Sequence, residues 1–176
     1  LLCFVGWELA GFASWLLIGF ARERPQATGN ALFAFIANRI GDAGFLLAIS
    51  LAYWWLGSTD WEVLSGQHQI EALPTLTARL LVLGFVLAAF AKSAQLPFTP
   101  WIARALEGPT PSSAIFYGAV MIHAGVFLLI RLAPLLVQVP DVMALLTAVG
   151  LLTAVYAYLQ ALSSSDIKSA LVFATV

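Results

Sequence analysis

Long apolar segments alternate with short polar connections along this chain. Five segments approach or exceed the roughly 20 residues that a helix needs to cross a bilayer. They cover residues 1–20, 30–55, 75–105, 112–136 and 142–162, and a sixth begins at 166 and runs to 176. Because backbone polar groups in hydrocarbon must be satisfied within their own segment, each is predicted to be a helix. The alternation over about ten residues that marks a transmembrane β-strand is missing from the sequence.

The connections between these segments are polar. Residues 21–29 contain two arginines and a proline, and the longest connection, 57–74, contains four ionisable residues: Asp60, Glu62, His68 and Glu71. The run SSSD at 163–166 is typical of a helix start. It predicts Asp166 as the N-cap or as an acid of the first turn.

Basic residues divide unequally between the two sets of segment ends. One set carries four of them: Arg22, Arg24, Arg104 and Lys168. The other set carries Arg79 and Arg131, together with most of the acids of the connections. Because Lys and Arg accumulate on the cytoplasmic side of membrane proteins, the first set is predicted to be cytoplasmic.

The composition supports a chain solvated by lipid. Of its 176 residues, 61% are hydrophobic and 10% are charged, and the mean hydropathy is +0.94, whereas soluble domains are about half apolar and about a quarter charged. We therefore predict an all-α, polytopic membrane helix bundle with one transmembrane domain over 1–176. Leu1 and Val176 both lie in apolar runs, so we expect an internal piece of a longer protein.

Composition also limits the classes of function. The net charge of −1 offers no basic surface for nucleic acid. Cys3, the one cysteine, has no partner for an internal disulfide. Paired-cysteine metal sites, phosphate-binding loops and nucleophiles with an evident base are missing from the sequence. We expect no cofactor and no metal to be bound by this chain.

The third segment is predicted to be a broken helix. It continues as AKSAQLPFTPWIARALEGPTP, with Pro97 and Pro100 three residues apart. Each proline lacks an N–H and crowds the carbonyl four residues before it, so carbonyls are left unpaired within the membrane. Such a break is tolerated where protein or water supplies partners, and transporters use it at ion sites.

Two ionisable residues inside apolar segments are candidates for proton transfer. A charge at the bilayer centre costs at least about 2.5 kcal/mol, so such residues are functional by default. Glu8, in GWELAGF, is a carboxyl that burial favours in its protonated form; a structural ion pair is the alternative. Lys92, five residues before Pro97, loses hydration and can exchange a proton with a movable partner. Alternatively it caps the carbonyls at the break or extends to the interface.

His123 lies half-way along the fourth segment and titrates near neutral pH, which suits a relay between water and Lys92. The alternative is a neutral histidine bonded to a neighbouring helix. A haem site is disfavoured, because the second histidine, His68, is in a polar connection. Tyr117, six residues earlier, lies about a third of a turn away from His123 and is a relay hydroxyl or a packed aromatic residue.

Arg39 and Asp42 lie inside the second segment, three residues apart and so on one helix face, where they can pair. A structural role for this pair is as plausible as a functional one. Arg131 is predicted to be an interfacial anchor. Lys168 and Asp166 start a helix and are expected at the surface or in a cytoplasmic funnel.

Several runs resemble one known family. GWELAGFASWLLIGF, NRIGD, AKSAQLPFTPWIARALEGPTPSSA and DIKSALVFAT follow each other as in the antiporter-like subunits of respiratory complex I, closest to the subunit 5 or chain L type. Large subunits of Mrp-type sodium/proton antiporters share the pattern. The resemblance spans nearly the whole chain. The runs KSAQLP and GPTPSSA are its most specific parts.

The resemblance implies roles for three residues. Glu8 corresponds to a membrane glutamate that modulates the protonation of a lysine on the broken helix, and Lys92 to that lysine. His123 corresponds to the next relay position. The family usually has a histidine where this chain has Tyr117, in SAIFYGAVMIHAG. This departure leaves the relay route and the type of complex open.

The resemblance also implies the setting. We expect proton translocation by a subunit of an NADH-quinone oxidoreductase-like complex, with quinone and electron transfer handled by other membrane subunits, in the bacterial inner membrane. The alternatives are an Mrp-type sodium/proton antiporter subunit and a membrane subunit of a hydrogenase or an inorganic-carbon uptake system. A structural membrane anchor for a soluble enzyme would not need buried Glu8, Lys92 and His123.

Overall fold

The fold consists of long helices that lie side by side. The computed structural model describes residues 1–64, 66 and 73–176; the predicted connection residues His68 and Glu71 lie outside these. The helices of the first half are α1 (Leu2–Ile18), α2 (Pro25–Leu56), α3 (Trp61–Leu64), α4 (Thr75–Lys92) and α5 (Pro100–Ala105). Those of the second half are α6 (Thr110–Ser113), the π-helix η1 (Ala114–Val120), α7 (Met121–Arg131), α8 (Ala133–Leu136), α9 (Pro140–Ser163) and α10 (Ile167–Thr175).

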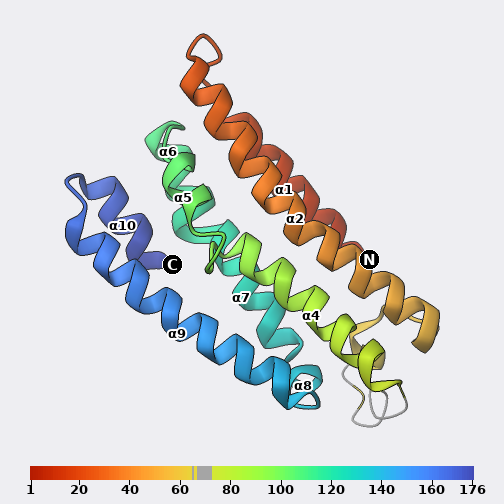
Figure 1. Cartoon of the computed structure of the whole chain (residues 1–176). Coiled ribbons are helices and arrows are strands. Elements are labelled where there is room, and N and C mark those ends of the chain that lie inside the picture. Colours follow the sequence, from red (N-terminus) through yellow and green to blue (C-terminus); the bar gives the residue numbers. More distant parts are fainter. Residues whose placement is uncertain (65, 67–72) are drawn as a thin grey trace.

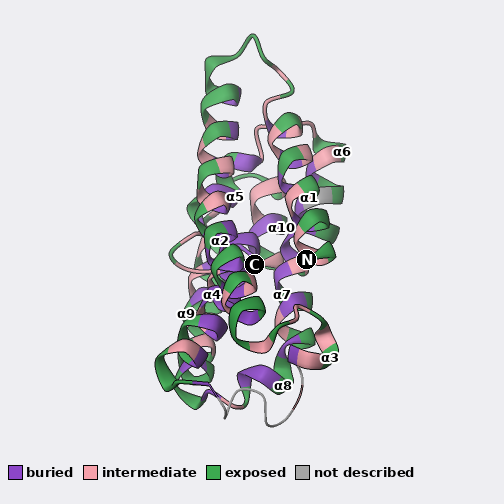
Figure 2. Ribbon diagram, turned by 90° about the vertical axis from the view of Figure 1, so that its right-hand side faces the viewer, coloured by how far each residue is buried: buried purple, intermediate pink, exposed green. Residues whose placement is uncertain are grey.

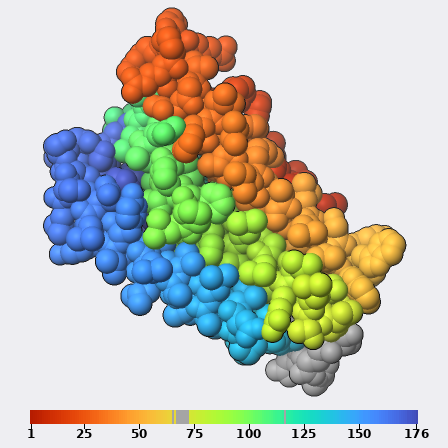
Figure 3. Space-filling model, viewed as in Figure 1, coloured from red at the N-terminus to blue at the C-terminus, as the bar shows by residue number. Residues whose placement is uncertain are grey.

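The order of the helices across the bundle places α4 near the centre. α1 and α2 form an antiparallel hairpin on one side, α9 runs along the opposite side, and α4 and α7 lie between them (Figure 1). In the space-filling view, α2 and α9 border the two sides of the same face (Figure 3). Ser93, Ala94 and Thr99 of the broken region after α4 are buried between these helices, whereas Pro97 is exposed. An irregular backbone is tolerated in a membrane where protein or water supplies partners.

Small residues let α2 and α4 approach closely. A Cβ atom on Gly44 would lie 2.9 Å from the Gly84 carbonyl oxygen, nearer than side-chain atoms normally come. Ala48 is completely buried beside this crossing. Small residues at helix crossings are the usual device in membranes, where apolar burial alone does not drive helix association.

The break in the third segment begins earlier than the prolines alone predict. α4 ends at Lys92, and Pro100 is the first residue of α5. Ala94 has a φ of +52°, in the left-handed region that turns the chain out of the helix. Pro97 then lies inside the irregular stretch and Pro100 starts the next helix, so the two prolines bound the second part of the break.

Side-chain hydrogen bonds connect the break to α5, α7 and α9. Thr153 of α9 accepts a hydrogen bond of 3.1 Å from the Leu96 N–H. Trp101 Nε1 donates to the Ala91 carbonyl at 2.8 Å, and Ser93 Oγ donates to the Ile122 carbonyl at 2.6 Å. The break is thus a built junction of α4, α5, α7 and α9.

Two further elements differ from the expected segments. α2 begins at Pro25, five residues before the expected start, because proline is favoured in the first helical turn and lets the polar residues after it join the helix. The segment expected at 112–136 is not one helix; it is divided into α6, η1, α7 and α8.

Asp166 is the N-cap of α10, as expected, and its carboxylate accepts a 2.8 Å hydrogen bond from the Ser169 N–H. Hydrogen bonds from Ser169 hold the pKa of Asp166 below its usual value.

Four helical stretches in the described residues are long and apolar enough to cross a membrane: Pro25–Leu56, Thr75–Lys92, Thr110–Arg131 and Pro140–Ser163. α1 is apolar but has 17 residues. Large apolar side chains of α1 and α9 face outward, whereas the interior surfaces of the bundle are buried (Figure 2). This distribution matches an integral membrane protein.

Candidate functional site

Lys92 is buried at the centre of the bundle, in the last turn of α4. Its side chain is 1% exposed, and Nζ donates a 3.1 Å hydrogen bond to the Trp7 carbonyl of α1. The ammonium also lies 5.0 Å from the centroid of the Trp7 ring. Gly11 makes room for it, since a Cβ at that position would lie 3.2 Å from Nζ. The backbone carbonyl and the ring of Trp7 thus hold the buried ammonium in place.

The carboxylate of Asp42 is linked to Lys92 through Trp7. Asp42 is buried on α2 and accepts a 2.8 Å hydrogen bond from Trp7 Nε1. Trp7 therefore contacts both charges, the acid through its ring nitrogen and the lysine through its carbonyl. The sequence placed Asp42 beside Arg39 and did not reveal that α2 brings it to Lys92.

Arg39 connects the two acids. Its guanidinium forms an ion pair with Glu8 of α1 and lies 3.6 Å from Asp42 on its own helix. It also lies over the Phe35 ring, at 4.6 Å from the centroid. The predicted pairing of Arg39 with Asp42 is confirmed. Glu8, Arg39, Asp42 and Lys92 are called the charge cluster below.

Glu8 forms its ion pair with Arg39, whose long side chain reaches from α2 to α1. Among the described residues, the buried Glu8 Oε1 has no hydrogen-bond partner.

His123 is not brought to Lys92. Its neighbour Ile122 is buried, with its carbonyl bonded to Ser93, and Gly125 packs against α4 at a point where a Cβ would lie 2.6 Å from the Ala89 carbonyl oxygen. One residue advances a helix by about 100°. His123 therefore faces outward and is exposed, so a direct step from Lys92 to His123 within this chain is not supported.

Tyr117 is a buried residue of the fourth segment that carries a hydroxyl. It is 1% exposed and lies in η1, where its ring packs edge-to-face with Trp101 at 5.9 Å. Within the described part of the chain its hydroxyl has no hydrogen-bond partner, although Ser14 lies close to it. π-Helical turns occur often at functional sites. Only the family departure at this position marked Tyr117 in the sequence.

Lys168 is not a free surface residue. It is half-buried on α10, and Nζ donates hydrogen bonds of 2.7 and 2.8 Å to the carbonyls of Leu106 and Gly108, directly after α5. Arg131 lies over the Trp61 ring at 5.5 Å, as an interfacial anchor would. Within the described ranges, no group of three or more His, Cys, Asp or Glu residues is placed to hold a metal ion.

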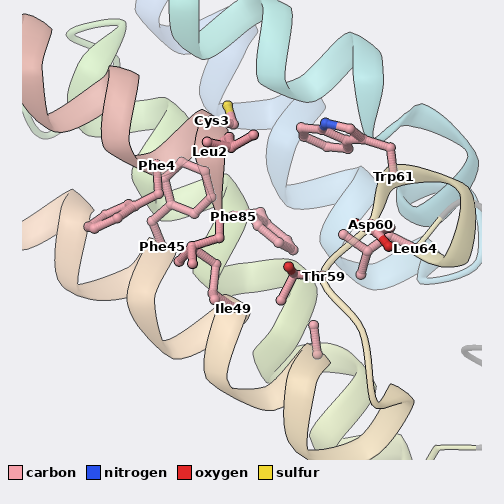
Figure 4. A pocket seen from close by; sticks show the side chains of 12 residues that line it. Leu2, Cys3, Phe4, Phe45, Ile49, Thr59, Asp60, Trp61, Leu64 and Phe85 are labelled. Carbon is pink, nitrogen blue, oxygen red and sulfur yellow. The ribbon is translucent and has the colours of Figure 1, made fainter.

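A cavity of about 230 Å³ lies near the charge cluster, on the side of the Phe45 ring. Rings of Phe4, Phe45 and Phe85 line one wall, and Trp61 lies on the other side (Figure 4). Phe45 also packs edge-to-face with Trp7 at 5.2 Å. Aromatic rings therefore separate this cavity from the charged side chains.

These features define a polytopic helical membrane protein with a buried lysine at a broken helix. The family described as "NADH:quinone oxidoreductase/Mrp antiporter, TM" matches residues 1–176. The chain belongs to this family, which confirms the resemblance seen in the sequence.

The relatives are considerably longer than this chain. It is 42% identical to NADH-ubiquinone oxidoreductase chain 5 of Geomys personatus over 98% of its own length and 28% of that protein. It is 41% identical to NAD(P)H-quinone oxidoreductase subunit 5 of the Paulinella chromatophora chromatophore, again over 98% of the chain and 27% of the relative. The chain thus spans about a quarter of these relatives.

Solved structures share the fold. A chain of the Mrp complex from Dietzia sp. superimposes with a TM-score of 0.90 at 33% identity, over 98% of this chain and 19% of that one. A chain of an archaeal membrane-bound sulfane sulfur reductase superimposes with a TM-score of 0.73 at 20% identity, over 98% and 36% of the two chains. The second likeness concerns the fold alone. Together they confirm the predicted antiporter-like helix bundle.

Proposed function

We propose that this chain forms the lysine-bearing part of a proton-translocating membrane subunit, and that Lys92 carries the proton. The observation that supports this most is the burial of the Lys92 ammonium at the end of an interrupted helix, in contact with Trp7, which also binds the Asp42 carboxylate. Buried ionisable residues are costly in membranes and mark proton paths.

The charge cluster supplies a way to change the affinity of Lys92 for its proton. With Glu8 held by Arg39, Asp42 is the acid that Trp7 links to Lys92. If Glu8 leaves Arg39 for Lys92, the lysine gains a second anion and holds its proton more firmly. Return of Glu8 to Arg39 favours release. Arg39 is the competing cation in this scheme, and Asp42 is the fixed anion.

The proton's route after Lys92 involves Tyr117 or His123. Tyr117 has a buried hydroxyl on the bundle side, whereas His123 lies on the outer face of α7. We assign His123 to a later step, in contact with a membrane segment outside this chain, because a histidine in an apolar helix needs a polar partner. Water at the Pro97–Pro100 stretch would complete the connection.

The proposed setting is a complex of several membrane subunits in a bacterial inner membrane. Relatives are named as subunits of NAD(P)H-quinone oxidoreductases. Redox energy would come from partner subunits that handle electrons and quinone, and this chain would bind no cofactor. The end with Arg22, Arg24, Arg104 and Lys168 is proposed to be cytoplasmic.

Replacing Lys92 tests this function. The full-length protein carrying Lys92→Ala should assemble in its complex but lose proton transport in reconstituted vesicles. Arg22→Ala, in the exposed connection after α1, is the matched control that removes a positive charge elsewhere. Transport by Lys92→Ala at the rate of the Arg22→Ala control would refute the proposal.

A sodium/proton antiporter subunit of the Mrp kind is the second candidate. It is favoured by the likeness to the Dietzia Mrp complex, with a TM-score of 0.90 at 33% identity. Proton flux that requires sodium and proceeds with no electron donor would support this alternative. Flux that requires an electron donor and is indifferent to sodium would support the first.

A further inference from the structure

The short helix α5 lies between Lys92 and Lys168. Its start contacts the residue next to Lys92, and the loop after its end binds Lys168 of α10. At its start, Trp101 Nε1 donates a 2.8 Å hydrogen bond to the Ala91 carbonyl, next to Lys92. At its end, Lys168 Nζ holds the carbonyls of Leu106 and Gly108. α5 is therefore fixed to α4 at one end and to α10 at the other.

The contacts at both ends are sheltered. Trp101 is fully buried. Gly108 is buried against the end of α1, so closely that a Cβ there would lie 2.9 Å from the Leu17 carbonyl oxygen. Hydrogen bonds from a charged donor are about twice as strong as neutral ones. The Lys168 ammonium, with two carbonyl acceptors, is thus a strong attachment of α10 to this loop.

We propose that Lys168 is a positioning residue for Lys92, acting through α5. By fixing the loop after α5, it fixes Trp101 and hence the last turn of α4, in which the Lys92 ammonium is held against Trp7. Loss of the attachment would leave α5 free to shift, and the break beside Lys92 would loosen. The proposal rests on the proposed function for its consequence in transport, and on the contacts alone for its effect on the break.

The break has a suitable position for a reporter. Thr99, the residue before α5, is 1% exposed, and its hydroxyl has no hydrogen-bond partner. Thr99→Cys therefore removes no side-chain hydrogen bond of the described structure. With Cys3 replaced by serine, and no other reactive cysteine in the full-length protein, its rate of reaction with a membrane-permeant maleimide reports the opening of the break.

The test compares labelling in membranes that contain the full-length protein in its complex. Lys168→Met, which keeps the length of the side chain and removes the donors, should raise the labelling rate at position 99 by about tenfold. Lys168→Arg, which retains donors, should restore slow labelling. Trp101→Phe should also raise the rate, and adding Lys168→Met to it should raise it little further, because both act through α5.

The controls separate this proposal from the proposed function and from general unfolding. In a protein that retains Cys3, the labelling rate of Cys3 should be the same with and without Lys168→Met. Equal labelling at position 99 in Lys168→Met and the parent would overturn the proposal, as would multiplied effects of Lys168→Met and Trp101→Phe. This readout does not require proton transport, so a failure of the proposed function leaves it intact. If transport is present, Lys168→Met should slow it and Lys168→Arg should restore it.

Discussion

At the scale of single residues, the charge cluster is a competition between two cations for two acids. Arg39 forms ion pairs with Glu8 and Asp42, and Trp7 contacts both Lys92 and Asp42. Buried charges are stable only when paired and hydrogen-bonded, and removing one partner costs more than the pair contributes. Each member of the cluster should therefore be sensitive to neutralisation, but not equally.

Neutralising Asp42 should impair transport more than neutralising Glu8. Asp42→Asn keeps an acceptor for Trp7 Nε1 but removes the anion that Trp7 links to Lys92, whereas Glu8 is paired with Arg39. We expect proton transport to fall by about tenfold, equivalent to roughly 1.4 kcal/mol of lost stabilisation. Glu8→Gln should have a smaller effect. Initial rates in vesicles decide the order, and an Asp42→Asn rate above that of Glu8→Gln would contradict it.

At the scale of the elements, a close helix contact and hydrogen bonds to neighbouring helices position the break. α7 meets α4 at Gly125, and α9 supplies Thr153 to the Leu96 N–H. Both contacts join a neighbouring helix to the interrupted segment. Substitutions at either contact should therefore affect the stability of the bundle and also the geometry beside Lys92.

Gly125→Ala should destabilise the bundle. The new methyl group would lie 2.6 Å from the Ala89 carbonyl oxygen, and α7 would have to move from α4. Overpacking of this kind costs about 1–3 kcal/mol. Gly118→Ala is the matched control, since nothing lies within 4 Å of the added methyl group. Thermal unfolding in detergent compares the two, and equal midpoints would show that the α4–α7 contact is not tight.

Thr153→Val should weaken the break without changing the size of the side chain. It removes the acceptor of the Leu96 N–H and leaves a buried donor unsatisfied, at a cost of about 1–3 kcal/mol. Thr147→Val is the control, because the Thr147 hydroxyl bonds only within α9, to the Met143 carbonyl. A lowered unfolding temperature and slower transport are expected for Thr153→Val alone. Identical behaviour of the two variants would argue against the role of Thr153.

At the scale of the whole molecule, the hydropathy pattern predicted the helices and the buried Lys92. It predicted the contacts between the helices less well. Pro97 and Pro100 indicated the break, and Lys92 was identified as a charged residue in an apolar run. The partnership of Asp42 with Lys92 depends on how α2 crosses α4, which spacing along one helix does not encode. The outward direction of His123 depends on the face that α7 presents to α4.

Some of the site was hidden because its polar groups are backbone atoms. Lys92 bonds the Trp7 carbonyl and Lys168 bonds carbonyls after α5, and any residue type supplies a carbonyl. The start of α2 was missed for the opposite reason: its first residues are polar, and a hydropathy pattern assigns them to a connection. Local sequence patterns therefore predicted part of the site, and the tertiary contacts of the structure supplied the rest.

The most direct test of the account is the ratio of protons moved to electrons passed by the assembled complex in vesicles, with Lys92→Ala compared with the Arg22→Ala control. If Lys92 carries protons, the ratio should fall in Lys92→Ala and stay at the parental value in the control. An unchanged ratio and rate in an assembled Lys92→Ala complex would contradict the account.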